Sequence, residues 1–127
     1  MADKEIIATD AAPAAIGPYS QAVRAGGFVF LSGQIPLDPA TGEMVTGAIE
    51  GQTQQVMKNL EAVLTAAGTS FDKVVRATIY LTDLADFAKV NAIYGERFPN
   101  HSPARATVQV AALPRAANVE IDLVAIA

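Results

Sequence analysis

The chain has 127 residues, which suits a single domain over residues 1–127, and 51% of them are hydrophobic whereas only 17% are charged. Because an average globular protein is roughly a quarter charged, this shortage of charge predicts that other copies of the chain cover part of the surface. The net charge of −4, with lysine and arginine scattered singly, argues against nucleic acid as a partner, and the lack of cysteine excludes disulfides and thiolate chemistry.

Targeting, membrane and cofactor signals are missing from the sequence. Residues 1–9 place charges ahead of a few apolar residues, which fits neither a secretory nor a transit signal. No run of about 20 apolar residues predicts a membrane span, and the composition fits a reducing compartment such as the cytoplasm. The single histidine, His101, has no second histidine or cysteine with which to share a metal, so no metal site is expected. Without a P-loop, a dinucleotide fingerprint or a Gly-x-Ser-x-Gly turn, we expect no cofactor and no serine nucleophile.

Hydrophobic periodicity divides the chain into strands and helices. Short apolar runs predict six strands, at residues 6–8, 21–25, 28–32, 74–81, 104–111 and 119–127. Gly26-Gly27 should form the hairpin turn between the second and third strands, because both glycines tolerate positive φ. Helical spacing predicts an amphipathic helix over 49–67, followed by Gly68, and a second helix that Thr82-Asp83 caps and Pro99 ends.

The predicted elements assemble into an α+β fold with two helices on one face of a mainly antiparallel sheet. The buried side of residues 74–81 should carry Val75, Ala77, Ile79 and Leu81. The buried face of the second helix should carry Leu84, Phe87, Val90, Tyr94 and Phe98. The last two strands are expected to pair with each other in antiparallel fashion. Because the last strand is apolar on both sides, the second sheet face needs a cover, which another subunit would supply.

Two opposite charges lie inside the two terminal strands. Arg105 is near the start of one strand and Glu120 near the start of the other, and charges are rarely buried without a partner or a purpose. Arginine can hold a carboxylate through two hydrogen bonds, and a carboxylate across the site can take a proton from water. The pair therefore suits a small substrate with a carboxyl group. The same pattern also fits the solvent-exposed faces of an edge hairpin, and alternation alone does not separate the two interpretations.

Two further candidates lie at loop boundaries. Tyr19 ends a glycine- and proline-containing loop, and such loops commonly present residues at a site. Packing of its ring under the hairpin is an equally good interpretation. Ser32-Gly33 ends a strand, where a hydroxyl and free backbone N–H groups can point at a ligand.

Five segments, in order, closely resemble the signature blocks of the RidA/YjgF family. They are AAPAAIGPYSQAV (11–23), FLSGQIPLDPATGE (30–43), DLADFAKVNAIYGERF (83–98), PARATVQVAALP (103–114) and VEIDLVAIA (119–127). The resemblance covers nearly the whole chain. It implies a chorismate-mutase-like α+β fold that assembles as a homotrimer with sites in the clefts between subunits. It also implies cofactor-free hydrolysis of 2-aminoacrylate, or 2-iminopropanoate, and of 2-iminobutanoate to 2-keto acids and ammonia.

The resemblance also assigns roles to single residues. Arg105 corresponds to the arginine that pairs with the substrate carboxylate, Glu120 to the acid that positions or activates the attacking water, and Tyr19 joins them as a catalytic residue. Positions that line the family's cleft are assigned to substrate binding: Ser32, Gly33, Phe87, Asn91 and Thr107. Because Thr107 stands where many family members have a cysteine, any activity that depends on that thiol should be absent.

Two other functions stay open at this stage. Endoribonuclease or translation-inhibitor activity has been attributed to some family members, but the acidic net charge and the single histidine argue against it here. A non-catalytic sensor of keto or amino acids could use Arg105 to bind its ligand without turnover. Loss of Glu120 would distinguish the sensor, whose affinity should survive, from the hydrolase, whose rate should fall.

Overall fold

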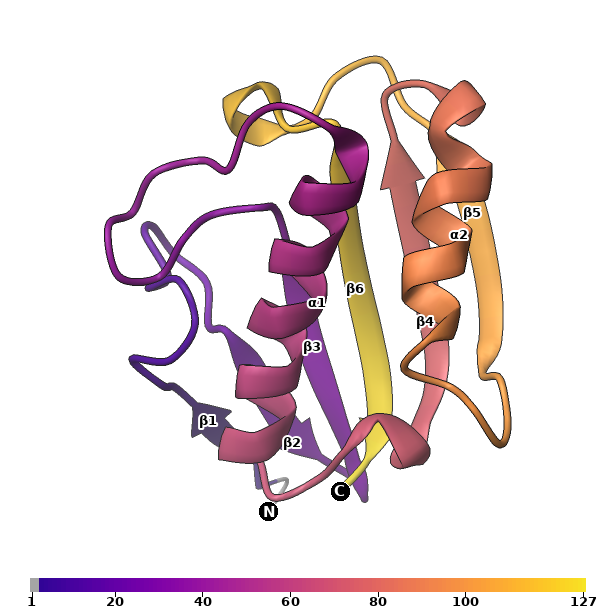
Figure 1. Cartoon of the computed structure of the whole chain (residues 1–127). Coiled ribbons are helices and arrows are strands. Elements are labelled where there is room, and N and C mark those ends of the chain that lie inside the picture. Colours follow the sequence, from indigo (N-terminus) through magenta and orange to yellow (C-terminus); the bar gives the residue numbers. More distant parts are fainter. Residues whose placement is uncertain (1–2) are drawn as a thin grey trace.

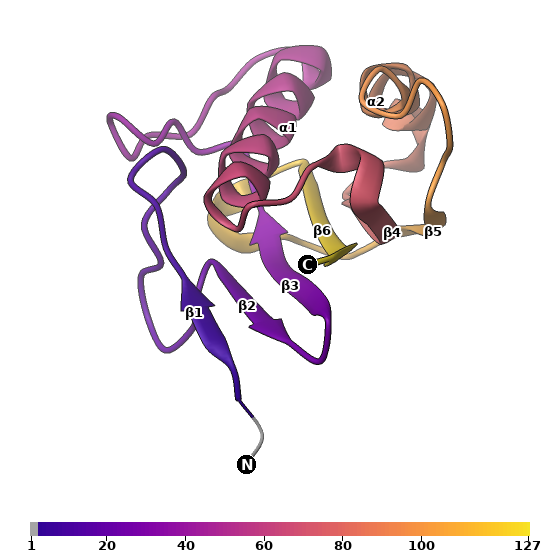
Figure 2. The ribbon, with the colours of Figure 1, turned by 90° about the horizontal axis from the view of Figure 1, so that it is seen from below.

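The computed structural model describes residues 3–127, which form one six-stranded sheet with two helices on one face (Figures 1 and 2). The elements are β1 (Glu5–Ile7), β2 (Ala22–Ala25), β3 (Phe28–Gln34), α1 (Ile49–Ala66), β4 (Val74–Leu81), α2 (Phe87–Gly95), β5 (Ala104–Gln109) and β6 (Val119–Ile126). Short 3-10 turns cover Phe71–Lys73, Leu84–Asp86 and Pro114–Ala116. The strand order is β1-β2-β3-β6-β4-β5, and only β4 and β5 are parallel. The predicted α+β class is confirmed.

The two terminal strands do not pair with each other, so that part of the prediction is wrong. β6 lies between β3 and β4 and is antiparallel to both, whereas β5 lies at the sheet edge beside β4. Helix α2 connects β4 to β5, and a helical crossover joins parallel strands. The inward side chains of β6 gain most burial at the centre of the sheet, and all four are buried: Val119, Ile121, Leu123 and Ala125.

Local signals place the turns and helix ends correctly. Gly26 and Gly27 have φ of 57° and 83° and form the tight turn between β2 and β3. Gly68 follows α1 with φ of 76°, a left-handed conformation that ends the helix. Between the helices and the sheet lies an apolar core whose largest fully buried side chains include Met57, Leu60, Leu64, Ile79 and Ile121.

Two predicted core positions are wrong. Val75 is exposed, because an irregularity in the β4–β6 register between Val74 and Arg76 places Val74 inward instead. Leu84 is also exposed, because it lies in a 3-10 turn that precedes α2. Asp83 caps this turn by accepting a hydrogen bond from the backbone N–H of Ala85.

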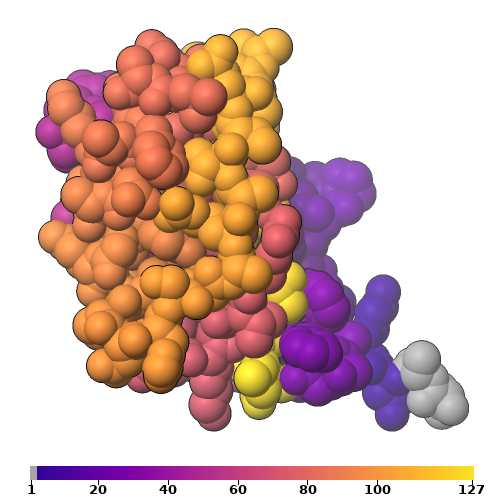
Figure 3. Space-filling view, turned by 90° about the vertical axis from the view of Figure 1, so that its right-hand side faces the viewer, coloured from indigo at the N-terminus to yellow at the C-terminus, as the bar shows by residue number. Residues whose placement is uncertain are grey.

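The sheet face opposite the helices leaves large apolar side chains uncovered. Strand alternation directs away from the helices a set of residues that are 37–48% exposed: Phe28, Phe30, Val75, Val108 and Ile126. The edge strand β5 and helix α2 lie side by side at the surface (Figure 3). Within residues 3–127, no helix combines the length and hydrophobicity that crossing a membrane requires.

Candidate functional site

Glu120 lies beside a cavity of about 390 Å³ between the loop that precedes β2, the segment that follows β3 and the turn that precedes β6. Most of its wall is apolar, with Ile16 and Leu37 among the lining residues. Tyr19, Glu120 and Arg115 add a phenol, a carboxyl group and a cation to this wall. A small ligand with one polar end and one apolar end fits such a lining.

Gly33 makes room for the carboxyl group of Glu120. A Cβ built at Gly33 would overlap Oε2 of Glu120 and lie 2.8 Å from its Cδ. β3 and β6 are neighbours in the sheet, so the side chain of Glu120 lies over the bare backbone of Gly33. Any side chain at position 33 would therefore displace the carboxyl group of Glu120.

Burial and a neighbouring charge change the acidity of Glu120. Burial raises the pKa of Glu120 above the usual glutamate value, and the negative charge of Asp122 raises it further. Asp122 in turn accepts a hydrogen bond of 2.9 Å from the hydroxyl of Tyr80. A carboxylate whose pKa is raised is a stronger base, so Glu120 is suited to take a proton from water.

Arg105 lies on the other face of the sheet, against helix α2. Its Nη1 donates a hydrogen bond of 2.6 Å to Oδ1 of Asn91. Its Cζ lies 5.5 Å from the ring centre of Phe87 and 5.1 Å from that of Tyr94. Three residues at helical spacing on α2 therefore fix the guanidinium group. Burial raises the pKa of Tyr94, and the charge of Arg105 opposes this shift.

Arg105 also lines a second cavity, of about 450 Å³, together with Asn91, Tyr94 and Ser102. The structure thus groups the predicted residues around two centres. Tyr19 and Gly33 lie with Glu120, whereas Phe87 and Asn91 lie with Arg105. Within one chain, Arg105 and Glu120 are not brought together.

The other two predicted binding residues, Ser32 and Thr107, line neither the Glu120 cavity nor the Arg105 cavity. The hydroxyl of Ser32 donates a hydrogen bond to the backbone carbonyl of Ser20, so it ties the Tyr19 loop to β3. Thr107 is two residues from Arg105 on β5 and is aligned with Ile79 of β4, which places it on the helix side of the sheet.

Sequence reasoning missed two residues that organise these centres. Tyr94 was assigned only to the core, although its distance from Phe87 and Asn91 along α2 indicated a shared face. Gln21 gave no signal in the sequence. Its buried carboxamide accepts a hydrogen bond from the N–H of Thr9 and donates to the carbonyls of Thr9 and Pro13, at 2.7, 3.0 and 2.7 Å. This closes the loop that carries Tyr19.

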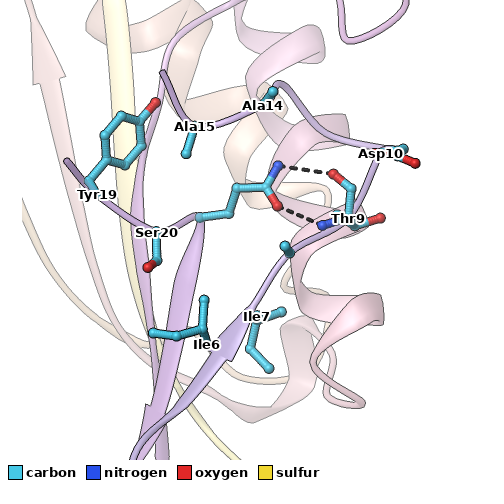
Figure 4. A pocket seen from close by; sticks show the side chains of 10 residues that line it. Ile6, Ile7, Thr9, Asp10, Ala14, Ala15, Tyr19 and Ser20 are labelled. Carbon is cyan, nitrogen blue, oxygen red and sulfur yellow. Dashed lines mark hydrogen bonds between the residues drawn. The ribbon is translucent and has the colours of Figure 1, made fainter. Parts of the chain in front are cut away.

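Figure 4 shows a further cavity, lined by β1 and by the loop that carries Tyr19, with the hydrogen bonds between Gln21 and Thr9 drawn. This cavity measures about 540 Å³ and is the larger of the two that Tyr19 lines. Asp10 is the one charged residue in its lining. It offers no combination of acid, base and cation, so the chemistry is expected at Glu120 and Arg105.

The chain matches the family model described as Endoribonuclease L-PSP over residues 9–127. It is 61% identical over 125 residues to Protein DfrA of Myxococcus xanthus, an alignment that covers 97% of this chain and 95% of the relative. It is 48% identical over 123 residues to the 2-iminobutanoate/2-iminopropanoate deaminase of Mus musculus, with 97% and 91% covered.

Solved structures of similar proteins have the same fold. YyfA of Yersinia pestis, a protein of unknown function of the conserved Rid protein family, superposes with a TM-score of 0.97 at 49% identity, covering 98% of this chain and 100% of that chain. TdcF of E. coli with bound serine superposes with a TM-score of 0.91 at 40% identity, covering 97% and 98%.

Proposed function

The chain belongs to the RidA/YjgF family, which the Endoribonuclease L-PSP model describes, and on that premise we propose that it is an imine deaminase. Its substrates are 2-aminoacrylate, or 2-iminopropanoate, and 2-iminobutanoate, and its products are 2-keto acids and ammonia. The observation that carries the proposal is the carboxyl group of Glu120, half-buried over Gly33 beside a cavity and with a raised pKa. Relatives named as 2-iminobutanoate/2-iminopropanoate deaminases support the reaction class.

The reaction needs one base that later acts as an acid. Water beside Glu120 gives a proton to the carboxylate while its oxygen attacks the carbon of the protonated C=N bond, forming a carbinolamine with a neutral amino group. Glu120 then returns this proton to the nitrogen, and the C–N bond breaks as the C=O bond forms. The hydroxyl proton passes to the carboxylate of Glu120 and from there to the departing ammonia, which leaves as ammonium. Tyr19, in the same cavity wall, is placed to orient the substrate. The proton balance closes without a cofactor.

The carboxylate of the substrate needs a cation, and we assign this role to Arg105 of a second copy. Arg105 and Glu120 of one chain lie on opposite faces of the sheet and line separate cavities. The uncovered apolar sheet face and the low charge content support a homotrimer with its sites between subunits. Serine bound to TdcF shows that one relative takes a ligand with an amino and a carboxyl group.

A coupled assay tests the reaction. A dehydratase generates the imine from threonine or serine, and release of the keto acid is timed with and without this protein. Glu120→Gln should lower kcat by about 10² to 10⁴-fold, the usual contribution of general base catalysis, while affinity for 2-oxobutanoate survives. Arg105→Ala should lower kcat/KM by at least ~10-fold and weaken 2-oxobutanoate binding with it, because charge-assisted hydrogen bonds contribute about 1.5–3 kcal/mol each. A parent rate for Glu120→Gln would refute the proposal.

Mixing the two inactive variants tests the shared site. If Arg105 and Glu120 come from different subunits, reassorted Arg105→Ala and Glu120→Gln chains at equal ratio should form intact sites at roughly a quarter of the positions. Activity should therefore return to roughly a quarter of the parent value after reassembly. Light scattering should give three times the chain mass. If verified mixed trimers recover no activity, the active site does not combine Arg105 and Glu120 from different subunits, and the shared-site proposal is wrong.

The same experiments also test two other functions. A sensor of keto or amino acids would bind 2-oxobutanoate without accelerating imine hydrolysis. Endoribonuclease activity, which the description of the family model names, would require RNA binding that weakens steeply with salt. With 13 acidic residues against nine lysines and arginines, we expect no such binding.

A further inference from the structure

Glu120 and Asp122 lie on the same face of β6, because side chains alternate along a strand. In the neighbouring strand β4, Tyr80 is aligned with Glu120 and Thr78 with Asp122. The hydroxyl of Tyr80 nevertheless reaches diagonally and donates its hydrogen bond of 2.9 Å to Oδ2 of Asp122. A residue of the neighbouring strand, Tyr80, thus holds the carboxylate of Asp122, two residues from Glu120 on β6.

The residues around Glu120 differ in charge from one side of its side chain to another. On one side of β6 lies β3, where Gly33 leaves its backbone bare, and on the other side lies β4 with Tyr80, whereas Asp122 is two residues further along β6 itself. Tyr19 and the cation Arg115 line the same cavity, and under the proposed function Arg105 of a second copy adds another cation there. The carboxyl group of Glu120 lies over Gly33 and lines the cavity, and the negative charge of Asp122 disfavours its ionised form.

We propose that Asp122 is a positioning residue for Glu120, and that Tyr80 holds Asp122 in that role. The inference rests on the proposed deaminase function. Neither Asp122 nor Tyr80 is among the residues that line the Glu120 cavity of one chain. Their effect acts through Glu120: a fixed negative charge keeps its carboxyl group turned to the cavity and favours its uptake of a proton from water.

The pH dependence of kcat/KM separates this role from a structural one. Glu120 acts as a base only when ionised, so activity is lost as the pH falls through its pKa. Asp122 contributes to raising the pKa of Glu120, after burial. Asp122→Asn removes this contribution, so the acid limb of the profile should move to lower pH. Tyr80→Phe, which frees the Asp122 side chain, should move the limb in the same direction by less.

Asp72→Asn is the matched control, because it removes one negative charge from an exposed position in the 3-10 turn before β4. Its profile should coincide with that of the parent. The coupled dehydratase must be in excess at every pH, so that imine supply never limits the rate. Unfolding is followed for all variants, because a purely structural Asp122 would change stability and leave the acid limb in place.

A double variant makes the test specific to Glu120. In a Glu120→Gln background, Asp122→Asn should leave the residual rate unchanged, because no carboxyl group is left to position. An acid limb that stays in place in Asp122→Asn, while Glu120→Gln is inactive, would overturn the positioning role and leave the deaminase proposal intact. An active Glu120→Gln enzyme would instead overturn the proposed function.

Discussion

Replacement of Gly33 by alanine should separate turnover from stability. The added Cβ would overlap Oε2 of Glu120 and lie 2.8 Å from its Cδ and 3.0 Å from its Cγ. The backbone itself accepts alanine, because Gly33 is not among the glycines with a left-handed φ. The conflict is therefore with the far part of a flexible side chain, which can rotate away.

The two consequences differ in size. Moving Glu120 off its preferred rotamer costs about 0.5–1.5 kcal/mol, so the free energy of unfolding should fall by no more than this. Displacement of a catalytic group by about 1 Å can cost ~10²-fold in rate, and complete loss of a general base costs up to ~10⁴-fold. We expect kcat of Gly33→Ala to fall by at least about 100-fold.

The coupled dehydratase assay and urea unfolding measure the two quantities on the same preparation. Gly51→Ala is the control, because a Cβ at Gly51, in α1, meets no atom within 4 Å. That variant should gain about 1 kcal/mol of helix stability and keep its parent turnover. A Gly33→Ala protein with parent kcat would show that the carboxyl group does not act from its place over Gly33.

Three shorter predictions concern the residues around the two centres. Tyr94→Phe keeps the ring beside Arg105 and removes a buried hydroxyl that has no hydrogen-bond partner within residues 3–127, so KM should not change. Tyr94→Leu removes the ring, and KM should rise about 2- to 30-fold for a cation–π contact of about 0.5–2 kcal/mol. Gln21→Leu leaves the N–H of Thr9 and the carbonyl of Pro13 without partners, so urea unfolding should show a loss of at least about 2 kcal/mol. Because the pKa of Glu120 is raised on folding, its ionisation destabilises the fold as pH rises from the usual value of about 4.3 through the raised value. Glu120→Gln should therefore unfold at a higher temperature than the parent at pH 7 and at the same temperature below about pH 4, and a lower melting temperature at pH 7 would contradict this reasoning.

The elements that sequence reasoning placed correctly are those fixed by nearby residues. Gly26-Gly27 determines the β2–β3 turn, Gly68 ends α1, and the β-branched run from Val74 to Leu81 forms β4 with the predicted bounds. The second helix was less well placed, because Asp83 caps a 3-10 turn and the α-helix begins only at Phe87. A capping residue specifies a helical turn but not whether that turn is α or 3-10.

The relation between Arg105 and Glu120 could not be predicted, because it depends on strand pairing far along the chain. Both residues are aligned with β4, Arg105 with Ala77 and Glu120 with Tyr80. These two β4 positions are three residues apart, and an odd separation along a strand places side chains on opposite faces. A direct antiparallel hairpin of the last two strands would have allowed both charges to share a face. The inserted position of β6 removes that option, which is why the proposed site combines Arg105 and Glu120 from two copies of the chain.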